Sequence, residues 1–284
     1  MNSSRHRNIS LRPARRHHLL AIHSGFIILL GIVLLPSGCS RGASGGGLTV
    51  AGSTSIQPFA DRWAEIYQRI HPDRIVNVQG GGSSAGIQAA RSGAAQIGMS
   101  SRELKPDEKD LTEFIVARDG LAVIVHPLNL LRGIGLAQVR DIFRGRIKTW
   151  QELGQGSGGI TIVTREEGSG TRGAFQELVM HKERIVREAI VEDSNGTVRA
   201  IVAQDPRSIG YISLGLVDKT VRALALDGIE ANDPNILAGR YPLVRPFLFV
   251  TNGPPGPEAR AFIEFILSAD GQELVESGGL LRAR

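Results

Sequence analysis

The chain has 284 residues, of which 42% are hydrophobic, and a formal net charge of +5. All of the excess positive charge lies in residues 1–38, which hold five arginines and no acidic residue. From residue 39 onward, 28 lysines and arginines (33 minus 5) face 28 acidic residues, so the body lacks the clustered basic footprint of a nucleic-acid-binding domain. The single cysteine excludes a disulfide within the chain, so the hydrophobic core must hold the body together.

Residues 1–38 have the pattern of a bacterial export signal. An arginine- and histidine-rich start precedes an apolar run from Leu19 to Leu35, and Pro36-Ser-Gly-Cys39 follows. A small residue before the cysteine resembles the lipobox of bacterial lipoproteins, with Pro36 where leucine or valine is usual. This resemblance implies a lipoprotein signal peptide, lipidation of Cys39 with palmitate, and a membrane-anchored protein in the periplasm or at the cell surface.

An uncleaved membrane anchor is the alternative for this segment, because about 17 apolar residues are at the short limit for a spanning helix. Residues 39–47 are rich in glycine and serine and predict a flexible tether. About 245 residues then remain, which suits one large domain or two small ones.

The first half of the body predicts alternating strands and helices. Strands are expected at 48–50, 75–78 and 96–102, because short apolar segments there run into polar loops. A helix is expected from Thr54 and Ser55 onward, and a second over 85–92. An apolar face with helical spacing predicts the first helix, and it consists of Phe59, Trp63, Ile66 and Ile70. Gly93 is the expected stop of the second helix.

The second half predicts a further lobe and a return to the first. Buried strands are expected at 120–125, 160–164 and 209–212, with helices around Val139 and Phe143 and beyond Thr171. The chain crosses back near 241–250 and ends with a closing helix over 258–267. Two crossings predict a hinged clamp with its ligand between the lobes.

Three of the predicted strands lead into loops of glycine and hydroxyl residues that open helices. These loops are Ala51-Gly-Ser-Thr-Ser55, Gly80-Gly-Gly-Ser-Ser84 and Arg165-Glu-Glu-Gly-Ser-Gly-Thr171. A helix N-terminus leaves backbone N–H groups unpaired and carries partial positive charge, so it is a ready anion site. Three such loops that converge could surround a tetrahedral oxyanion.

Five motifs in this order resemble the phosphate-binding proteins of bacterial high-affinity phosphate ABC importers, the PstS family. They are Ala51-Gly-Ser-Thr-Ser55, Gly82-Ser-Ser-Ala-Gly-Ile87, Ile97-Gly-Met-Ser-Ser-Arg102, Arg165-Glu-Glu-Gly-Ser-Gly-Thr171 and Ile209-Gly-Tyr211. The resemblance covers residue 48 to the C-terminus. It implies an α/β, two-lobed periplasmic-binding-protein fold (type II-like), with a mixed sheet flanked by helices in each lobe and the ligand in the interlobe cleft. We expect residues 48–122 plus 247–284 to form lobe 1 and residues 123–246 to form lobe 2.

The same resemblance implies capture of inorganic phosphate and its delivery to an ABC transporter permease, without catalysis, cofactor or metal, by a monomer. Arg165 is implied as the phosphate-binding arginine and Glu167 as the acid that orients it. The guanidinium fork suits two phosphate oxygens. The other implied phosphate-binding residues are Ser53, Thr54, Ser55, Ser83, Ser84, Ser101, Arg102, Ser169, Gly170 and Thr171.

One position departs from the best-known members of the family. Ser101 stands where they have an aspartate that accepts a hydrogen bond from protonated phosphate. Sulfate has no proton to donate, so that aspartate rejects it, whereas a serine hydroxyl can donate or accept. We expect phosphate to remain preferred, with weaker selectivity over sulfate or arsenate. Arg102 is expected to add a second positive contact.

Other interpretations of these residues remain open. The Gly80 loop loosely fits a dinucleotide-binding turn, but the acidic residue expected later is absent. Thr54, Ser83 and Thr171 could each be ordinary helix caps. His71, His126 and His181 lack metal-ligand spacing. The alternative functions are a phosphate sensor for a membrane signalling system, a receptor for another tetrahedral oxyanion, and a phosphatase. For a phosphatase, the sequence lacks a metal cluster and an activated nucleophile motif.

Overall fold

The structure is a computed structural model that describes residues 47–283. The predicted signal peptide, Cys39 and the tether up to residue 46 therefore lie outside the described residues. The chain divides into two units, Met1–Ser44 and Gly45–Arg284, and every described helix and strand belongs to the second.

The described elements alternate between strands and helices along the chain. The strands are β1 (Leu48–Gly52), β2 (Val76–Gln79), β3 (Ile97–Ser100), β4 (Thr112–Val125), β5 (Gly133–Ile134), β6 (Thr161–Arg165), β7 (Ile190–Glu192), β8 (Ser208–Ser213), β9 (Arg222–Ala223), β10 (Ala225–Leu226) and β11 (Val244–Thr251). The α-helices are α1 (Gln57–Ile70), α2 (Ser83–Ser92), α3 (Leu136–Phe143), α4 (Gly170–Leu178), α5 (Asn195–Gln204), α6 (Asp233–Leu237), α7 (Pro257–Leu267) and α8 (Ala269–Ser277). Short 3-10 helices are η1 (Pro106–Glu108), η2 (Trp150–Leu153) and η3 (Leu214–Leu216).

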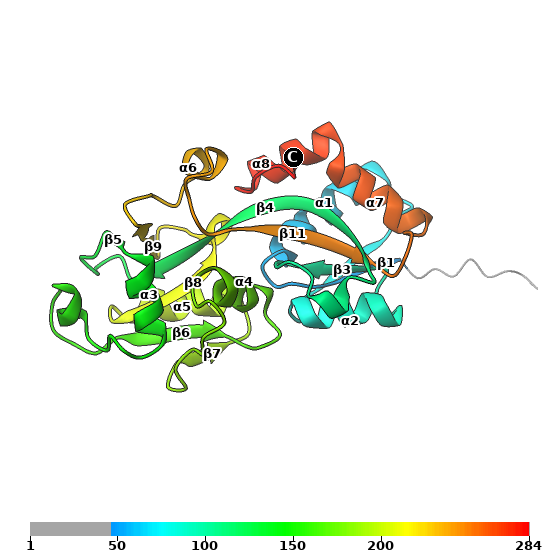
Figure 1. Cartoon of the computed structure of the whole chain (residues 1–284). Coiled ribbons are helices and arrows are strands. Elements are labelled where there is room, and N and C mark those ends of the chain that lie inside the picture. Colours follow the sequence, from blue (N-terminus) through cyan, green and yellow to red (C-terminus); the bar gives the residue numbers. More distant parts are fainter. Residues whose placement is uncertain (1–46, 284) are drawn as a thin grey trace, which may run out of the picture. The chain divides into compact units, whose positions relative to one another are not determined.

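Most strands belong to one mixed sheet, with the order β2-β1-β3-β11-β4-β8-β6-β7 and with β9 also paired to β4. β1 runs parallel to β2 and β3, β6 runs parallel to β7 and β8, and β11 runs antiparallel to β3 and β4. The two long strands β4 and β11 lie side by side and join the β1–β3 part of the sheet to the β6–β8 part (Figure 1). The sequence predicted a return crossing near residues 241–250, the region that holds β11, and the assignment of both crossings stays a prediction.

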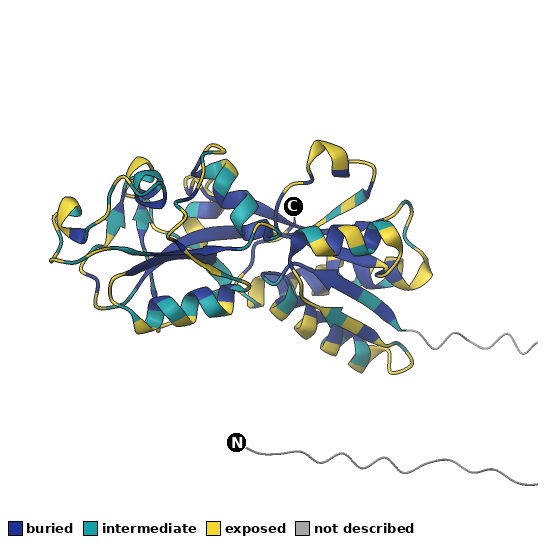
Figure 2. Ribbon diagram, turned by 90° about the horizontal axis from the view of Figure 1, so that it is seen from below, coloured by how far each residue is buried: buried dark blue, intermediate teal, exposed yellow. Residues whose placement is uncertain are grey.

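The hydrophobic core separates into two regions along β4 and β11. One region takes its residues from 48–117 and 247–280, and the other from 121–243 together with Leu281. We call them lobe 1 and lobe 2. The central strands β3, β8 and β11 are almost entirely buried, whereas β2, β7 and the start of β4 carry exposed residues. The helices turn their exposed residues outward (Figure 2). The boundaries between residues 122 and 123 and between 246 and 247 stay a prediction.

Helices cover both faces of the sheet in each lobe. In lobe 1, α1, α7 and α8 pack on one face through Trp63, Phe262 and Val275, and α2 packs on the other through Ile87. In lobe 2, α3 and α4 share one cluster with β8, while α5 joins the cluster on the opposite face. In the first helix, the predicted apolar face is buried at Phe59 and Trp63. The prediction is wrong at the C-terminal end of this helix, where Ile66 is only partly buried and Ile70 is 58% exposed.

The backbone of α2 lies unusually close to the sheet. A Cβ on Gly86 would lie 2.4 Å from the Ala51 carbonyl oxygen, and a Cβ on Gly98 would lie 2.4 Å from the Gly86 carbonyl oxygen. Glycines at these positions let the start of α2 approach the ends of β1 and β3. The packing therefore fixes the three loops of lobe 1 relative to one another.

Some element ends differ from the sequence prediction. The first helix begins at Gln57 rather than at Thr54, because Ser53 to Ile56 form a turn in which the Ser53 carbonyl accepts from the N–H groups of Ile56 and Gln57. The strand expected over 96–102 is shorter, and β4 begins at Thr112 rather than at Gly120. The second helix ends as predicted, with Gly93 at a φ of 77°.

Candidate functional site

Loops from both lobes meet where β1, β3 and β6 end. Ser53 Oγ donates to Ser101 Oγ at 2.9 Å, and the Ser101 N–H donates to Ser83 Oγ at 3.1 Å. Across the lobes, Ser55 Oγ lies 2.6 Å from Thr171 Oγ1. All five side chains are buried. The structure thus brings together hydroxyl groups that the sequence predicted for one site but that lie up to 118 residues apart.

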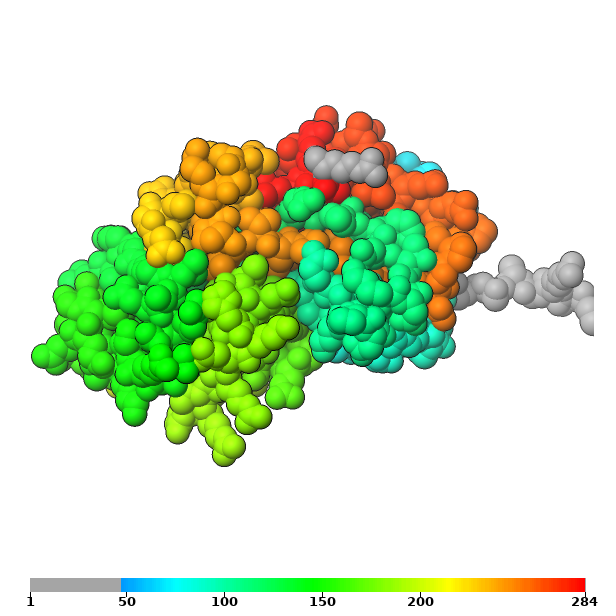
Figure 3. Space-filling view, in the orientation of Figure 1, coloured from blue at the N-terminus to red at the C-terminus, as the bar shows by residue number. Residues whose placement is uncertain are grey.

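The third loop packs directly on lobe 1. A Cβ on Gly170 would lie 2.1 Å from Ser83 Oγ and 2.6 Å from Ser101 Oγ, so a larger residue would force these groups apart. The Ser84 N–H donates to the Gly168 carbonyl at 3.1 Å. Residues around 100 and residues around 170–200 accordingly lie against each other on the face shown in Figure 3.

Two helix starts contribute to this point. Ser169 is the N-cap of α4, and its Oγ accepts from the Arg172 N–H at 3.2 Å. Gly170 and Thr171 then occupy the first two helical positions, whose N–H groups have no partner inside a helix. Ser83 is likewise the first helical residue of α2. These N–H groups make the site favourable for negative charge.

Arg165 is the central cation of the site. Its side chain is 1% exposed, Nε donates to the Glu192 carbonyl at 3.1 Å, and Nη2 donates to Thr54 Oγ1 at 3.1 Å and to the Asp193 carbonyl at 2.7 Å. Nη1 is also buried, yet it has no hydrogen-bond partner among the described residues. An unpaired buried guanidinium nitrogen is costly, so this atom indicates where an anion would be bound.

The acid that orients Arg165 is Glu166. Its Oε2 accepts from Arg165 Nε at 3.0 Å and its Oε1 accepts from Nη2 at 3.1 Å. The sequence prediction named Glu167, which is exposed and makes no contact of this kind in the structure. The turn after β6 decides between the two neighbouring acids, because it directs residue 166 back toward the guanidinium and residue 167 outward.

Arg102 does not add an unpaired positive charge to the site. Its Nη1 and Nη2 donate to Glu108 Oε2 at 2.6 Å and Oε1 at 2.9 Å, and both side chains are buried. Burial opposes ionisation of Glu108, but the hydrogen bonds from Arg102 and from the Lys105 N–H outweigh burial and lower the pKa of this carboxyl. Arg102 Nη2 also donates to Ser84 Oγ at 3.4 Å. The predicted second positive contact is therefore largely neutralised.

A second buried ion pair lies behind the hydroxyl groups. Arg245 Nε and Nη2 both donate to Asp119 Oδ2, at 2.9 and 2.8 Å, and these residues are direct partners in the pairing of β11 with β4. Arg245 Nη1 donates to the Ser101 carbonyl at 3.3 Å. Burial raises the pKa of the Asp119 carboxyl, and the charge of Arg245 opposes this rise. The sequence analysis did not select this pair, although charged residues inside apolar strands were a usable signal.

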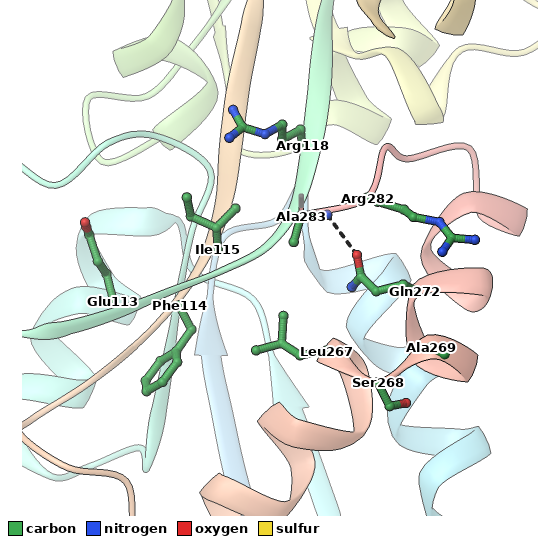
Figure 4. A pocket seen from close by; sticks show the side chains of 10 residues that line it. All are labelled: Glu113, Phe114, Ile115, Arg118, Leu267, Ser268, Ala269, Gln272, Arg282 and Ala283. Carbon is green, nitrogen blue, oxygen red and sulfur yellow. Dashed lines mark hydrogen bonds between the residues drawn. The ribbon is translucent and has the colours of Figure 1, made fainter.

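Among residues 47–283, no cluster of His, Cys, Asp and Glu side chains could hold a metal ion. In the same range, no helix is long and apolar enough to cross a membrane. A surface pocket of about 810 Å³ lies between the first half of β4 and the C-terminal segment (Figure 4). Phe114, Leu267 and Gln272 line it, and none of the predicted site residues does.

Comparisons with known proteins agree with this geometry. Residues 38–270 match the PBP superfamily domain. The phosphate-binding protein PstS of Bacillus subtilis is 36% identical over 235 residues, which cover 81% of this chain and 78% of that protein. PstS of Pseudomonas aeruginosa is 31% identical over 268 residues, which cover 83% of each chain.

Solved structures show the same similarity. A Clostridium perfringens protein solved with bound phosphate is 39% identical, with a TM-score of 0.82 over 84% of this chain and all of that chain. An ABC-type phosphate transport receptor from Vibrio cholerae is 35% identical, with a TM-score of 0.71 over 82% of this chain and 99% of that chain. The predicted two-lobed α/β fold is confirmed. The chain belongs to the PBP superfamily and, within it, to the PstS family of phosphate-binding proteins.

The Arg102–Glu108 pair predicts a specific pH dependence of stability. Because the pKa of Glu108 is lower in the folded protein than its ordinary value of 4.5, its ionised form stabilises the fold above that value, and this contribution is lost as the pH falls through the folded pKa. We expect Glu108→Gln to lower the free energy of unfolding at pH 7 by about 1–3 kcal/mol. Between about pH 5 and pH 3 the variant should lose less stability than the wild type.

Urea unfolding at a series of pH values measures this difference. Glu113→Gln is the matched control, because Glu113 forms only an exposed pair with Lys109. Parallel stability curves for wild type and Glu108→Gln would show that the pair does not contribute in this way.

Proposed function

We propose that this protein captures inorganic phosphate outside the cytoplasm and delivers it to the permease of an ABC transporter. The observation that carries the proposal is the buried Nη1 of Arg165, which has no hydrogen-bond partner within residues 47–283 and belongs to a site built from helix starts and hydroxyl groups. The names of the related proteins support phosphate as the anion and transport as the role.

The donors of the site suit a small tetrahedral anion. Arg165 Nη1 offers two N–H bonds, and the first residues of α4, at the end of the same loop, offer main-chain N–H groups. Hydrogen bonds to charged groups contribute about 1.5–3 kcal/mol each. Several of them, less the costs of desolvation and immobilisation, are enough for a dissociation constant near the micromolar range, about −8.2 kcal/mol.

Binding without chemistry is the function that the hydroxyl contacts support. The side chains of Ser53, Ser55, Ser83 and Ser101 hydrogen-bond to other hydroxyls, to the Asn195 amide and to the Arg245 guanidinium, and within residues 47–283 none of them hydrogen-bonds to a histidine. A nucleophilic serine needs an adjacent general base. The site is also complete within one chain, which supports a monomer as the functional unit.

Replacement of Arg165 tests the central cation. We expect Arg165→Ala to weaken phosphate binding by about 100-fold or more, because the charged donor and its hydrogen bonds are both lost. The phosphate affinity of Arg165→Lys should lie between those of the wild type and Arg165→Ala, since lysine keeps the charge but loses the planar fork. Isothermal titration of a soluble form that begins after residue 40 measures the affinities.

Arg207→Ala is the control for this experiment, because Arg207 is exposed and pairs only with Asp205. Thermal unfolding without phosphate shows whether each variant is folded. If folded Arg165→Ala binds phosphate as tightly as the wild type, the proposed site is wrong.

We also propose that selectivity against sulfate is weak. Among the described residues, Ser101 Oγ has hydrogen-bond contacts with the hydroxyls of Ser53 and Ser83, so position 101 itself offers a hydroxyl and not a carboxylate that would repel a fully ionised anion. Sulfate at millimolar concentration should therefore reduce the apparent phosphate affinity. Ser101→Asp should remove this competition, because an acceptor-only group rewards a protonated ligand.

Competition calorimetry with phosphate, sulfate and arsenate tests this proposal, with Ser92→Asp on the surface of α2 as a charge-matched control. Complete indifference of the wild type to millimolar sulfate would refute weak selectivity.

Membrane attachment through a lipid on Cys39 is a further part of the proposed function. The support is the sequence pattern around Cys39, which lies outside the described residues. Cells that express the full chain should incorporate labelled palmitate into the protein and retain it in the membrane fraction. Cys39→Ala should abolish both, and labelling that survives this substitution would exclude Cys39 as the modified residue.

A further inference from the structure

Asn195 is a buried side chain that connects the two lobes. It is the first residue of α5 and is 1% exposed. Its Oδ1 accepts from the Ser213 backbone N–H at 3.2 Å, and its Nδ2 donates to Ser55 Oγ at 2.8 Å. A backbone N–H can only donate, so the amide atom facing Ser213 must be the oxygen. The atom facing Ser55 is therefore the NH2 group.

Arg245 approaches the same hydroxyl from another side. Two of its nitrogens bind Asp119, whose other oxygen accepts from Ser213 Oγ at 2.8 Å, and this arrangement fixes the plane of the guanidinium. Arg245 Nη2 then donates to Ser55 Oγ at 3.4 Å. Ser55 Oγ thus faces two groups that can only donate hydrogen bonds.

The direction of the next hydrogen bond follows from these contacts. A serine hydroxyl has two acceptor positions and one proton. Asn195 and Arg245 use both acceptor positions, so the Ser55 proton must point to Thr171 Oγ1, 2.6 Å away. Thr171 Oγ1 then acts as an acceptor toward Ser55, and its own proton is left for another partner.

We propose that Asn195, supported by Arg245, is a positioning residue that orients the hydroxyl proton of Thr171 toward the bound anion. The inference rests on the proposed phosphate site, because Thr171 lies in the first turn of α4 beside Gly170. A hydroxyl pair without these two donors could point either way and would have to reorient on binding. Donors that are oriented in advance cost no reorganisation when the charge arrives.

A double-mutant cycle on phosphate affinity tests this chain of hydrogen bonds. We expect Asn195→Ala and Ser55→Ala each to weaken phosphate binding by about tenfold, the effect of one lost hydrogen bond to a charged group. If Asn195 acts through Ser55, the double variant should also be weaker by only about tenfold. Thr171→Val should show the same lack of additivity with Ser55→Ala.

A purely structural role of Asn195 predicts a different result. The effect of Asn195→Ala on phosphate affinity would then add to that of Ser55→Ala, and the double variant would bind phosphate about 100-fold more weakly than the wild type. This outcome would overturn the proposal. Unchanged affinity in Asn195→Ala would overturn it as well. Asn129→Ala is the matched control, since Asn129 is a buried asparagine of lobe 2 that caps the Leu131 N–H away from the site. It should lower thermal stability without changing phosphate affinity.

A replacement variant and a wild-type binding measurement complete the experiment. If Asn195→Ala does not fold, Arg245→Lys replaces it in the cycle with Ser55→Ala, because lysine retains the charge beside Asp119 but loses the nitrogen that reaches Ser55. Additivity in that cycle would count against the inference in the same way. If the wild type shows no heat and no thermal shift with phosphate, the proposed function fails, whereas tight wild-type binding with additive variants removes only the positioning role.

Discussion

The site depends on the buried guanidinium group of Arg165, in which Nε and Nη2 are hydrogen-bonded while Nη1 has no partner in the described part of the chain. Main-chain carbonyls, Thr54 and Glu166 accept from Nε and Nη2 of Arg165, so the side chain has a single fixed orientation. A buried positive charge is stable only when it is paired. Glu166 is about one-third exposed and pairs with only one side of the guanidinium. In the proposed site, the remaining nitrogen Nη1 is the group that an anion would neutralise.

The rest of the site is neutral, and this neutrality concentrates the positive field at one place. Arg102 and Arg245 are also buried, but each is paired with its own carboxylate, Glu108 or Asp119. Hydroxyl groups and helix starts fill the remaining space. They offer donors without adding charge, so the site accepts an anion without having to bury several cations that repel one another in its absence.

Much of this arrangement could be predicted from local sequence patterns. The strand, glycine-rich loop and helix succession identified both the α/β fold and the loops that form the site. Asn195, Asp119 and Arg245 were missed because their roles depend on contacts with residues up to 190 positions away. Glu166 was missed for the opposite reason. It adjoins the predicted Glu167, and only the backbone path after β6 decides which carboxylate turns toward Arg165.

The same buried residues serve the connection between the lobes and the arrangement of the site. Asp119 and Arg245 face each other on the neighbouring strands β4 and β11, so their pairing is local to those two strands. Ser55 belongs to lobe 1, whereas Asn195 and Thr171 belong to lobe 2. Any movement of one lobe away from the other separates Ser55 from Asn195 and Thr171 and leaves the hydroxyl protons without a defined direction. The donor pattern that favours an anion is therefore complete in the arrangement described here, in which Ser55 meets Asn195 and Thr171 while Arg165 donates to Thr54.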